Sequence, residues 1–255
     1  MARTQNGESV LTRAVRLIEA FEPGEEWLSV SVLARRSGLH VATASRLISE
    51  LTTHGWLERN SDRSVRLGLR LWEAAARASS TLSLREAAMP PLEALQAQVR
   101  QHTQLGVLDG EEVLFLERLS APDAVVNFTR IAGRLSLHAS SSGLVLLAHA
   151  PPAFQESVIS SHRERFTTDT PVQESHLREI LANIRRRGSV YCPGYLHPEA
   201  AGIAAPVFQD DTVRAAVSVV LPRSERAQQW EPAVRMAASL ISRRLSAPPN
   251  GVINQ

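Results

Sequence analysis

Apolar residues recur at helical spacing in three stretches near the start of the chain. The first stretch runs from Val10 to Phe21, and the second runs from Val30 to Ser37. In the third, from Val41 to His54, the apolar positions i, i+3, i+4 and i+7 form one buried face, made of Ala44, Leu47, Ile48 and Leu51. Gly38 supplies the tight turn before the third stretch, because a side chain there would crowd two helices. The pattern predicts a helix-turn-helix preceded by one further helix.

A short hairpin is predicted directly after this motif. Gly55 ends the third helix, and apolar residues then alternate in two strands, Trp56–Arg59 and Val65–Leu69. Residues 60–64 read as the turn between the strands. The outward positions of this hairpin are basic, namely Arg59, Arg63 and Arg66. A hairpin in this place is typical of the wing of a winged helix.

The exposed face of the third helix predicts contact with DNA. Its side chains are small, polar or basic, which a helix needs in order to enter the major groove. Arg46 suits a bidentate contact to guanine or phosphate, and Ser29 is the N-cap of the preceding helix. The candidate DNA-binding residues are Ser29, Ala42, Thr43, Ser45, Arg46, Ser49, Arg59, Arg63 and Arg66. A solvated surface explains the three hairpin arginines equally well.

A helical pattern leaves the wing. The stretch Leu69–Ala78 has an apolar stripe of Leu69, Leu71, Trp72 and Ala76, which is typical of a helix that joins or dimerises. Residues 79–81 interrupt the pattern, and it resumes from Leu84 to about Arg100. Pro90 and Pro91 predict a break or a fresh start in this second helix.

Strands and helices interleave in the remaining chain. Strands are expected at residues 103–108, 113–118, 125–130, 203–208 and 213–221, and helices at 144–150, 154–160, 174–187 and 228–245. Short hairpin turns join several of the strands, so the sequence predicts an α+β domain with a mostly antiparallel sheet. We expect a winged helix-turn-helix over residues 9–69, a linker helix over 70–84, an α+β domain over 85–246 and a disordered tail over 247–255.

Composition argues against a disulfide-bonded protein, a membrane-spanning protein and a CxxC metal site. The formal net charge is only +2. All 28 basic residues are arginine, so contacts to a phosphate must come from Arg side chains or from backbone N–H groups. Cys192 is the single cysteine, which excludes an intramolecular disulfide and a CxxC metal site. The first residues are polar and no stretch reads as a membrane span. We expect a cytoplasmic protein without cofactor or metal.

Motifs along most of the chain resemble the IclR family of transcriptional regulators. The matching segments are LTRAVRLIEAF, LARRSGL with TASRL, RLGLRL, LREAAMPPLEAL, GRLSLHASSSGLVLLA, RRRG, IAAPVF and AAVSVVLP. They span roughly residues 9 to 245, and their order along the chain is a more specific sign of the family than any single segment. The resemblance implies a winged helix followed by a GAF-like domain. It also implies a homodimer, or a tetramer made of dimers, that binds double-stranded operator DNA with palindromic symmetry and responds to small organic acids or aromatics.

The resemblance also implies an effector site. Acid-binding members hold a carboxylate on backbone amides at positions that correspond to Ser141 and Ser142, and a helix N-terminus suits an anion. Keto-acid-binding members then have Asp, Cys and two Ser, where this chain has Cys192, Gly202, Ser218 and Val220. This site is less polar, with walls extended by Leu135 and Asn127, so we expect a larger or more apolar effector with one anionic end.

Two alternatives remain at this stage. The segment 139–143 has the form A-x-S-x-G, in which Ser141 would be the nucleophile of a serine hydrolase, with Asp169 and either His176 or His197 as partners. No parallel βαβ series or Gly-rich oxyanion loop accompanies it. The other alternative is a thiol sensor at Cys192, whose pKa Arg185, Arg186 and Arg187 would lower.

Overall fold

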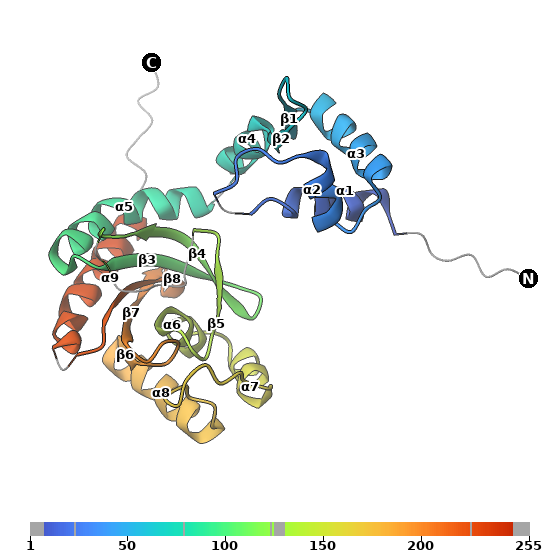
Figure 1. Ribbon diagram of the computed structural model, residues 1–255. Helices are drawn as coiled ribbons and strands as arrows, with labels where there is room; N and C mark the ends of the chain where they lie inside the picture. Colours follow the sequence, from blue (N-terminus) through green and yellow to red (C-terminus); the bar gives the residue numbers. More distant parts are fainter. Residues whose placement is uncertain are drawn as a thin grey trace, which may run out of the picture. The chain divides into compact units, whose positions relative to one another are not determined.

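The computed structural model describes residues 8–22, 24–78, 80–122, 124, 131–224 and 226–246 (Figure 1). The chain divides into two compact units, residues 1–79 and 80–255. Each unit has a hydrophobic core of its own.

The first unit is the predicted helix-turn-helix with its hairpin. Its elements are α1 (Val10–Glu19), α2 (Val30–Arg36), α3 (Val41–Thr53), β1 (Leu57–Arg59), β2 (Val65–Leu67) and α4 (Leu69–Ala78). The buried face of α3 consists of Ala44, Leu47 and Ile48, and it packs with Leu17, Leu33, Leu57 and Val65. Gly38 has a φ of +65°, which the turn between α2 and α3 requires and which glycine adopts without strain. The predicted crowding of two helices is wrong, because a Cβ at Gly38 would have nothing within 4 Å beyond its chain neighbours.

Side-chain caps define where these helices begin. Ser9 caps α1, and Ser29 caps α2 by accepting a hydrogen bond from the N–H of Val32 at 3.3 Å. His40 caps α3, where its Nδ1 accepts from the N–H of Ala42 at 3.4 Å. The sequence analysis predicted the cap at Ser29 and missed the one at His40.

The second unit is built on an antiparallel sheet of six strands in the order β5-β4-β3-β8-β7-β6. The strands are β3 (His102–Asp109), β4 (Glu112–Leu119), β5 (Arg134–Ser136), β6 (Val190–Pro193), β7 (Ala200–Gln209) and β8 (Thr212–Pro222). The helices are α5 (Ser80–Val99), α6 (Ser141–Ala148), α7 (Pro152–Ser160), α8 (Glu174–Arg187) and α9 (Glu231–Ser246), with a short 3₁₀ turn at Ala227–Trp230. This is the expected α+β domain with an antiparallel sheet.

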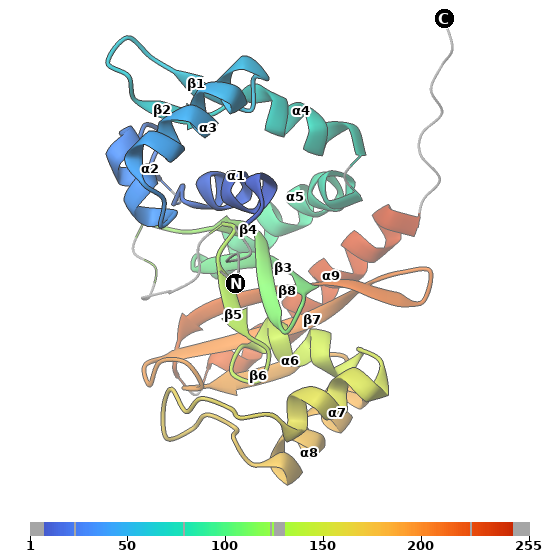
Figure 2. The ribbon, with the colours of Figure 1, turned by 90° about the vertical axis from the view of Figure 1, so that its right-hand side faces the viewer.

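The sheet separates two layers of core. Helices α5 and α9 bury Leu92, Leu95 and Ile241 against one face, and α6 and α8 bury Leu144, Leu147 and Leu181 against the other (Figure 2). Alternate residues of β7 and β8 contribute to the two layers, as the period of a strand requires. Helix α6 is apolar on all sides and every one of its residues is buried, so it lies in the interior beside the sheet.

Several details of the second unit differ from the sequence prediction. The predicted break at Pro90 and Pro91 is wrong, because α5 runs from Ser80 to Val99 through both prolines. The prolines remove the donors for the carbonyls of Glu86 and Ala87; Glu86 is exposed and Ala87 half-buried, so water can reach these groups. Burial of Ala88, Leu92 and Leu95 stabilises the uninterrupted helix, and Pro91 is itself buried.

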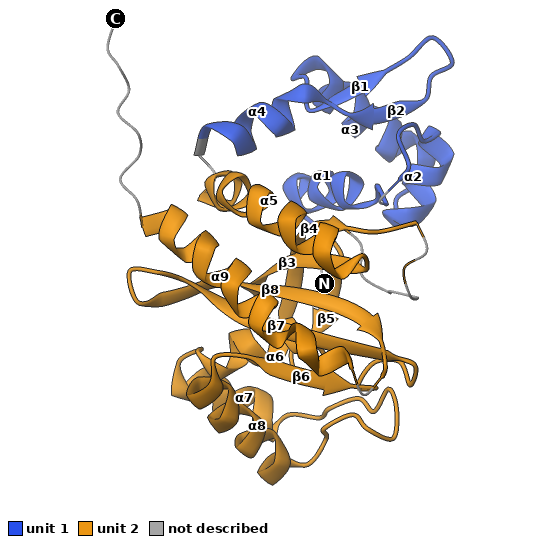
Figure 3. Ribbon diagram, turned by 90° about the vertical axis from the view of Figure 1, so that its left-hand side faces the viewer, with its two compact units in different colours: residues 1–79 blue, residues 80–255 orange. Residues whose placement is uncertain are grey.

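Two short strands were missed and one expected strand is not described. These strands are β5 and β6, which have three and four residues. The predicted strand over residues 125–130 lies outside the described residues. The boundary between the units falls at residue 79, where α4 and α5 are separated (Figure 3). Of the helices described, none is long and apolar enough to cross a membrane.

Candidate functional site

The outer face of α3 is open to solvent. Ala42, Arg46 and Ser49 are exposed, while Thr43 and Ser45 are half-buried. Arg46 forms no ion pair with any described acidic residue, so its guanidinium is available to an external anion. The sequence analysis predicted this exposed face from its small, polar and basic side chains.

The hairpin tip also presents an arginine. Arg63 is exposed and has a φ of +60°, at the point where the chain reverses. Asn60 stabilises this reversal: its Oδ1 accepts from the N–H of Ser64 at 2.8 Å, and its carbonyl accepts from the N–H of Arg63 at 3.1 Å. The tip therefore holds Arg63 away from the body of the unit.

The other two arginines of the hairpin are placed differently. Arg66 donates to Glu58 at 2.8 Å and to Glu26 at 3.0 Å, and its guanidinium lies 4.8 Å from the centre of the Trp27 ring. The hydrogen bond from Arg66 lowers the pKa of the Glu58 carboxyl. Arg59 is half-buried, and its Nε is shielded from solvent. Arg66 is thus engaged by acidic residues of its own unit, and Arg63 is the exposed arginine among the three.

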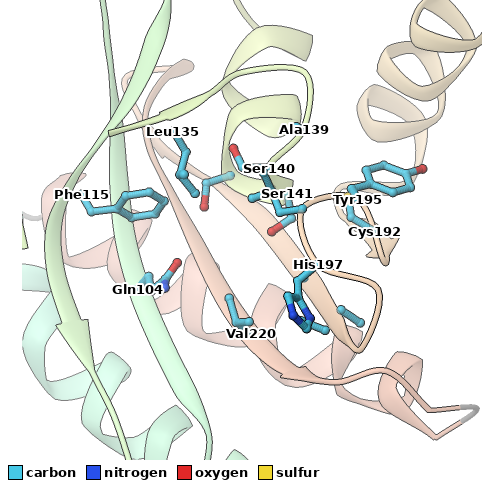
Figure 4. A pocket seen from close by; sticks show the side chains of 15 residues that line it. Gln104, Phe115, Leu135, Ala139, Ser140, Ser141, Cys192, Tyr195, His197 and Val220 are labelled. Atoms are coloured by element: carbon cyan, nitrogen blue, oxygen red, sulfur yellow. The ribbon is translucent and has the colours of Figure 1, made fainter. Parts of the chain in front are cut away.

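The second unit contains a pocket at the start of α6 (Figure 4). Ser140 is the N-cap of this helix: its Oγ accepts from the N–H of Gly143 at 3.1 Å and donates to the carbonyl of Ser136 at 3.0 Å. No described residue accepts a hydrogen bond from the N–H groups of Ser141 and Ser142. Both residues are buried and line the pocket. Unpaired, buried N–H groups at a helix N-terminus form a site for an anion.

Glycines allow the pocket wall to approach this helix. A Cβ added to Gly202 on β7 would stand 2.7 Å from the Oγ of Ser141. A Cβ at Gly143 would stand 2.5 Å from the backbone of Leu137. Gly202 therefore allows α6 to lie close to the sheet, and Gly143 allows it to lie close to the turn at Leu137.

A chain of hydrogen bonds leads from α6 across the sheet. The Ser142 hydroxyl donates to the Ser218 hydroxyl at 2.8 Å, and Ser218 donates to the Oε1 of Gln104 at 3.3 Å. Gln104 lies opposite Ser218 in the β3–β8 register, and both are about 1% exposed. Gln104 and Ser142 line the pocket, whereas Ser218 lies behind it.

The remaining walls are mostly apolar or neutral. Phe115, Leu135 and Val220 supply apolar surface, and Cys192 and Tyr195 form the side opposite Phe115. Burial raises the pKa of the Cys192 thiol and of the Tyr195 phenol well above their ordinary values. Both groups are neutral at pH 7, so neither of these two side chains repels a bound acid.

Most of the expected effector residues meet in this pocket. Those that line it are Leu135, Ser141, Ser142, Cys192, Gly202 and Val220. Asn127 lies outside the described residues. The sequence analysis missed Gln104, Phe115, Tyr195 and His197, which also line the pocket. Their positions on β3, on β4 and in the turn after β6 gave no local signal that they would converge.

The alternatives considered from the sequence find little support in the geometry. The Asp169 carboxylate accepts a hydrogen bond from the Nη1 of Arg223 at 2.6 Å. Its partner is therefore an arginine and not the histidine that a serine hydrolase would require. Cys192 is 3% exposed and its thiol is held neutral by burial, so the reactive thiolate is disfavoured. Arg185 donates instead to the carbonyl of Ala148 at 3.0 Å.

Comparison with known proteins identifies both units. The family described as "IclR helix-turn-helix domain" matches residues 10–61, and "Bacterial transcriptional regulator IclR C-terminal" matches residues 76–244. The transcriptional regulator XynR of Escherichia coli is 27% identical over 210 residues, covering 81% of this chain and 83% of its own. The uncharacterised regulator RhmR of the same species is 30% identical, covering 86% of this chain and 85% of its own.

A crystal structure gives a match of higher identity over most of the chain. An IclR homologue from Microbacterium hydrocarbonoxydans, complexed with 4-hydroxybenzoate, is 45% identical with a TM-score of 0.89, covering 94% of this chain and 100% of its own. These matches are to regulators of transcription. The chain belongs to the IclR family of bacterial transcriptional regulators.

Proposed function

We propose that this protein is a one-component transcriptional regulator of the cytoplasm, which binds operator DNA as a homodimer and responds to an aromatic carboxylic acid. The observation that carries the ligand class is the buried N-terminus of α6. Its two N–H groups, on Ser141 and Ser142, open into a pocket that is otherwise largely apolar. A ligand with one carboxylate and an apolar body satisfies both features.

The walls favour an aromatic ligand over a small keto acid. Cys192, Gly202 and Val220 stand where the resemblance implies Asp, Cys and Ser in keto-acid-binding members, so three polar contacts are missing. Phe115 and Leu135 provide surface for a ring. The relative from Microbacterium hydrocarbonoxydans, which is complexed with 4-hydroxybenzoate, supports the same class.

The proposed DNA contacts lie on α3 and the hairpin. Ala42, Thr43, Ser45, Arg46 and Ser49 would face the major groove, and Arg63 would contact the phosphate backbone. Ser29, at the N-cap of α2, is suited to a phosphate contact. A two-fold dimer would read a palindrome with half-sites about 34 Å apart, one turn of DNA. Effector binding would shift the linker helices and change the spacing of the two α3 helices.

Exposed apolar side chains support dimer formation through the first unit. Leu69 and Trp72 on α4 are 67% and 66% exposed, and Leu11 on α1 is 73% exposed. Large exposed apolar groups on the helices of a small domain are typical of a surface covered by a partner. A second copy of the chain is the occupant we propose, and pairing of dimers into tetramers is the alternative that a molar-mass measurement distinguishes.

Capture of sheared genomic DNA on the purified protein, followed by sequencing, tests the DNA-binding part of this proposal. We expect enrichment of one palindrome upstream of a gene cluster, and altered recovery when 4-hydroxybenzoate is present. Absence of any enriched sequence at about 0.1 M salt, with and without the acid, would contradict it. Thermal unfolding tests the ligand class: stabilisation by glyoxylate or pyruvate alone would contradict an aromatic effector.

A further inference from the structure

The turn between β6 and β7, residues 194–199, lies along one side of the effector pocket, and we call it the entry turn. We infer that the entry turn opens to let an effector in and out, and that the ion pair between Asp169 and Arg223 keeps it closed. The inference rests on the proposed function, because it describes how the ligand of that pocket is exchanged. It assigns a role to two residues that do not themselves line the pocket.

The entry turn separates the deep end of the pocket from solvent on this side. Ser142 and Cys192 line the pocket and are 1% and 3% exposed. Three consecutive residues of the entry turn, Tyr195, Leu196 and His197, line it as well and are half-buried. Figure 4 shows Cys192, Tyr195 and His197 along one side of the pocket. Displacement of the entry turn would therefore open a path to the buried end.

The entry turn is a closed loop with a flexible end. The N–H of Gly194 donates to the carbonyl of Ala200 at 2.8 Å, and the N–H of Ala200 donates to the carbonyl of His197 at 3.1 Å. Gly194 has a φ of +73°, which glycine adopts without strain. The two hydrogen bonds keep the loop together, and the glycine allows its backbone to rotate at one end. The loop can thus move as a unit.

The start of the entry turn is attached to the segment before α8. The Thr167 hydroxyl donates to the carbonyl of Gly194 at 2.6 Å. The Thr170 hydroxyl donates to the carbonyl of Tyr195 at 2.8 Å, and Thr170 is 3% exposed. Because this attachment is shielded from water, we take it as the fixed end of the turn.

The far end of the entry turn is attached to Arg223. Its Nη1 donates to the Asp169 carboxylate at 2.6 Å and to the carbonyl of Pro198 at 3.4 Å. Its backbone N–H donates to the carbonyl of Glu199 at 2.7 Å. Asp169 belongs to the same segment as the two threonines, so the ion pair fastens the far end of the turn to the segment that holds its start.

The ion pair is weak enough to separate in the folded protein. The side chains of Asp169 and Arg223 are 40% and 42% exposed. An exposed ion pair changes an equilibrium constant by up to about fivefold. It therefore favours the closed turn without locking it, which a turn that opens and closes during ligand exchange requires.

Cys192 provides a probe of opening that needs no effector. It is the single cysteine of the chain, and it is buried in the pocket. Iodoacetamide, a neutral reagent, should alkylate it in the full-length protein only while the pocket is open. We expect Asp169→Asn and Arg223→Gln each to raise the alkylation rate about two- to fivefold. The two variants change the net charge in opposite directions, so a shared increase reports the ion pair and not the charge.

Glu156→Gln is the matched control. It removes an exposed ion pair with Arg178 in the same unit, and neither residue lines the pocket. The alkylation rate should stay at the wild-type value. Urea unfolding of each variant verifies that it is folded, and an alkylation rate that is independent of low urea concentrations shows that the opening is local.

The rates of ligand exchange distinguish a turn that opens from a fixed wall. Because the ion pair lies outside the pocket, its loss should favour opening equally in the free and in the ligand-bound protein. Asp169→Asn should then raise the association and dissociation rates of 4-hydroxybenzoate by the same factor and leave the affinity unchanged. A fixed wall predicts faster dissociation alone and weaker binding. NMR line shapes during a titration give both rates.

The outcomes separate failure of the inference from failure of the proposed effector. Unchanged alkylation in both folded variants would overturn the role of the ion pair, whatever the effector is. Faster dissociation of 4-hydroxybenzoate without faster association would overturn it too, since the turn would then be a fixed wall. If the wild type binds no aromatic acid, the proposed effector class is wrong, and the alkylation rates still decide whether the entry turn opens.

Discussion

Gly202 lies so close to Ser141 that a Cβ at position 202 would stand 2.7 Å from the serine Oγ and 3.1 Å from its Cβ. Gly202→Ala should therefore displace the start of α6 and misalign the two N–H groups that we assign to the carboxylate. We expect about a tenfold loss of affinity for aromatic acids, on the order of one weakened charged hydrogen bond. Gly188→Ala is the control: it adds a methyl where no atom lies within 4 Å. It should cost stability because φ is +72°, but not affinity measured by titration.

Arg46 and Arg66 provide a matched pair for DNA binding. Arg46→Ala should cost about 1–3 kcal/mol and relax specificity at one base pair if the guanidinium reads a base. Arg66→Gln should change DNA affinity much less, because Glu58 and Glu26 already engage this side chain. Binding to a set of operators with single base changes checks both. A uniform loss across all sequences would assign Arg46 to the phosphate backbone.

Trp72 tests the proposed dimer surface. Trp72→Glu places a charge on the exposed apolar face of α4 and should convert the dimer to a monomer, with little change in the stability of the unit. Sedimentation or light scattering gives the molar mass. The neighbouring Glu73→Gln is the control, since the Glu73 carboxylate makes an exposed contact with Arg77 at 3.7 Å. Unchanged mass in Trp72→Glu would place the dimer contact elsewhere.

Two ion pairs of the second unit should differ in strength. The Glu117 side chain is 5% exposed and pairs with Arg85 at 2.7 Å, whereas Glu156 and its partner Arg178 are 57% and 46% exposed. Arg85→Ala leaves a buried carboxylate without its cation, so we expect a loss of about 1–3 kcal/mol. Arg178→Ala should cost below about 1 kcal/mol. Urea unfolding measures both, and equal losses would refute the distinction.

His138 should make stability depend on pH. Burial lowers its pKa below the ordinary value, and its Nε2 donates to the carbonyl of Glu164 at 2.9 Å. The unfolded chain therefore binds a proton at higher pH than the folded one does. This contribution to stability is complete above about pH 6.5 and is lost as the pH falls from there through the folded pKa. Unfolding free energies between pH 8 and pH 5 should fall less steeply in His138→Gln than in the wild type.

Local patterns were sufficient to predict the first unit. The apolar positions 44, 47 and 48 on α3 and the turn glycine at position 38 lie within one short segment. The helical spacing of the apolar residues and the positive φ of the glycine therefore suffice to predict the helix-turn-helix. The prolines of α5 show where a local rule is insufficient. Packing of Leu92 and Leu95 into the core outweighs the hydrogen bonds that the prolines remove.

The ligand pocket was predictable only in part, because local patterns reveal some of its residues and long-range strand pairing brings in the others. Ser141 and Ser142 belong to a segment whose helix start is visible in the sequence. Gln104 reaches the pocket because β3 pairs with β8, which begins more than a hundred residues later. Such pairing depends on the complete fold, and no spacing along the chain reveals it.

The order of the strands also has a consequence for synthesis of the protein. The first strand of the second unit, β3, has β4 on one side and the last strand, β8, on the other. Until the ribosome has released residue 222, β3 presents an unpaired edge, and Leu105 lacks its neighbour Val217. Chains cut short before β8 would expose this edge and aggregate. Formation of the sheet of the second unit thus waits until β8 has been translated.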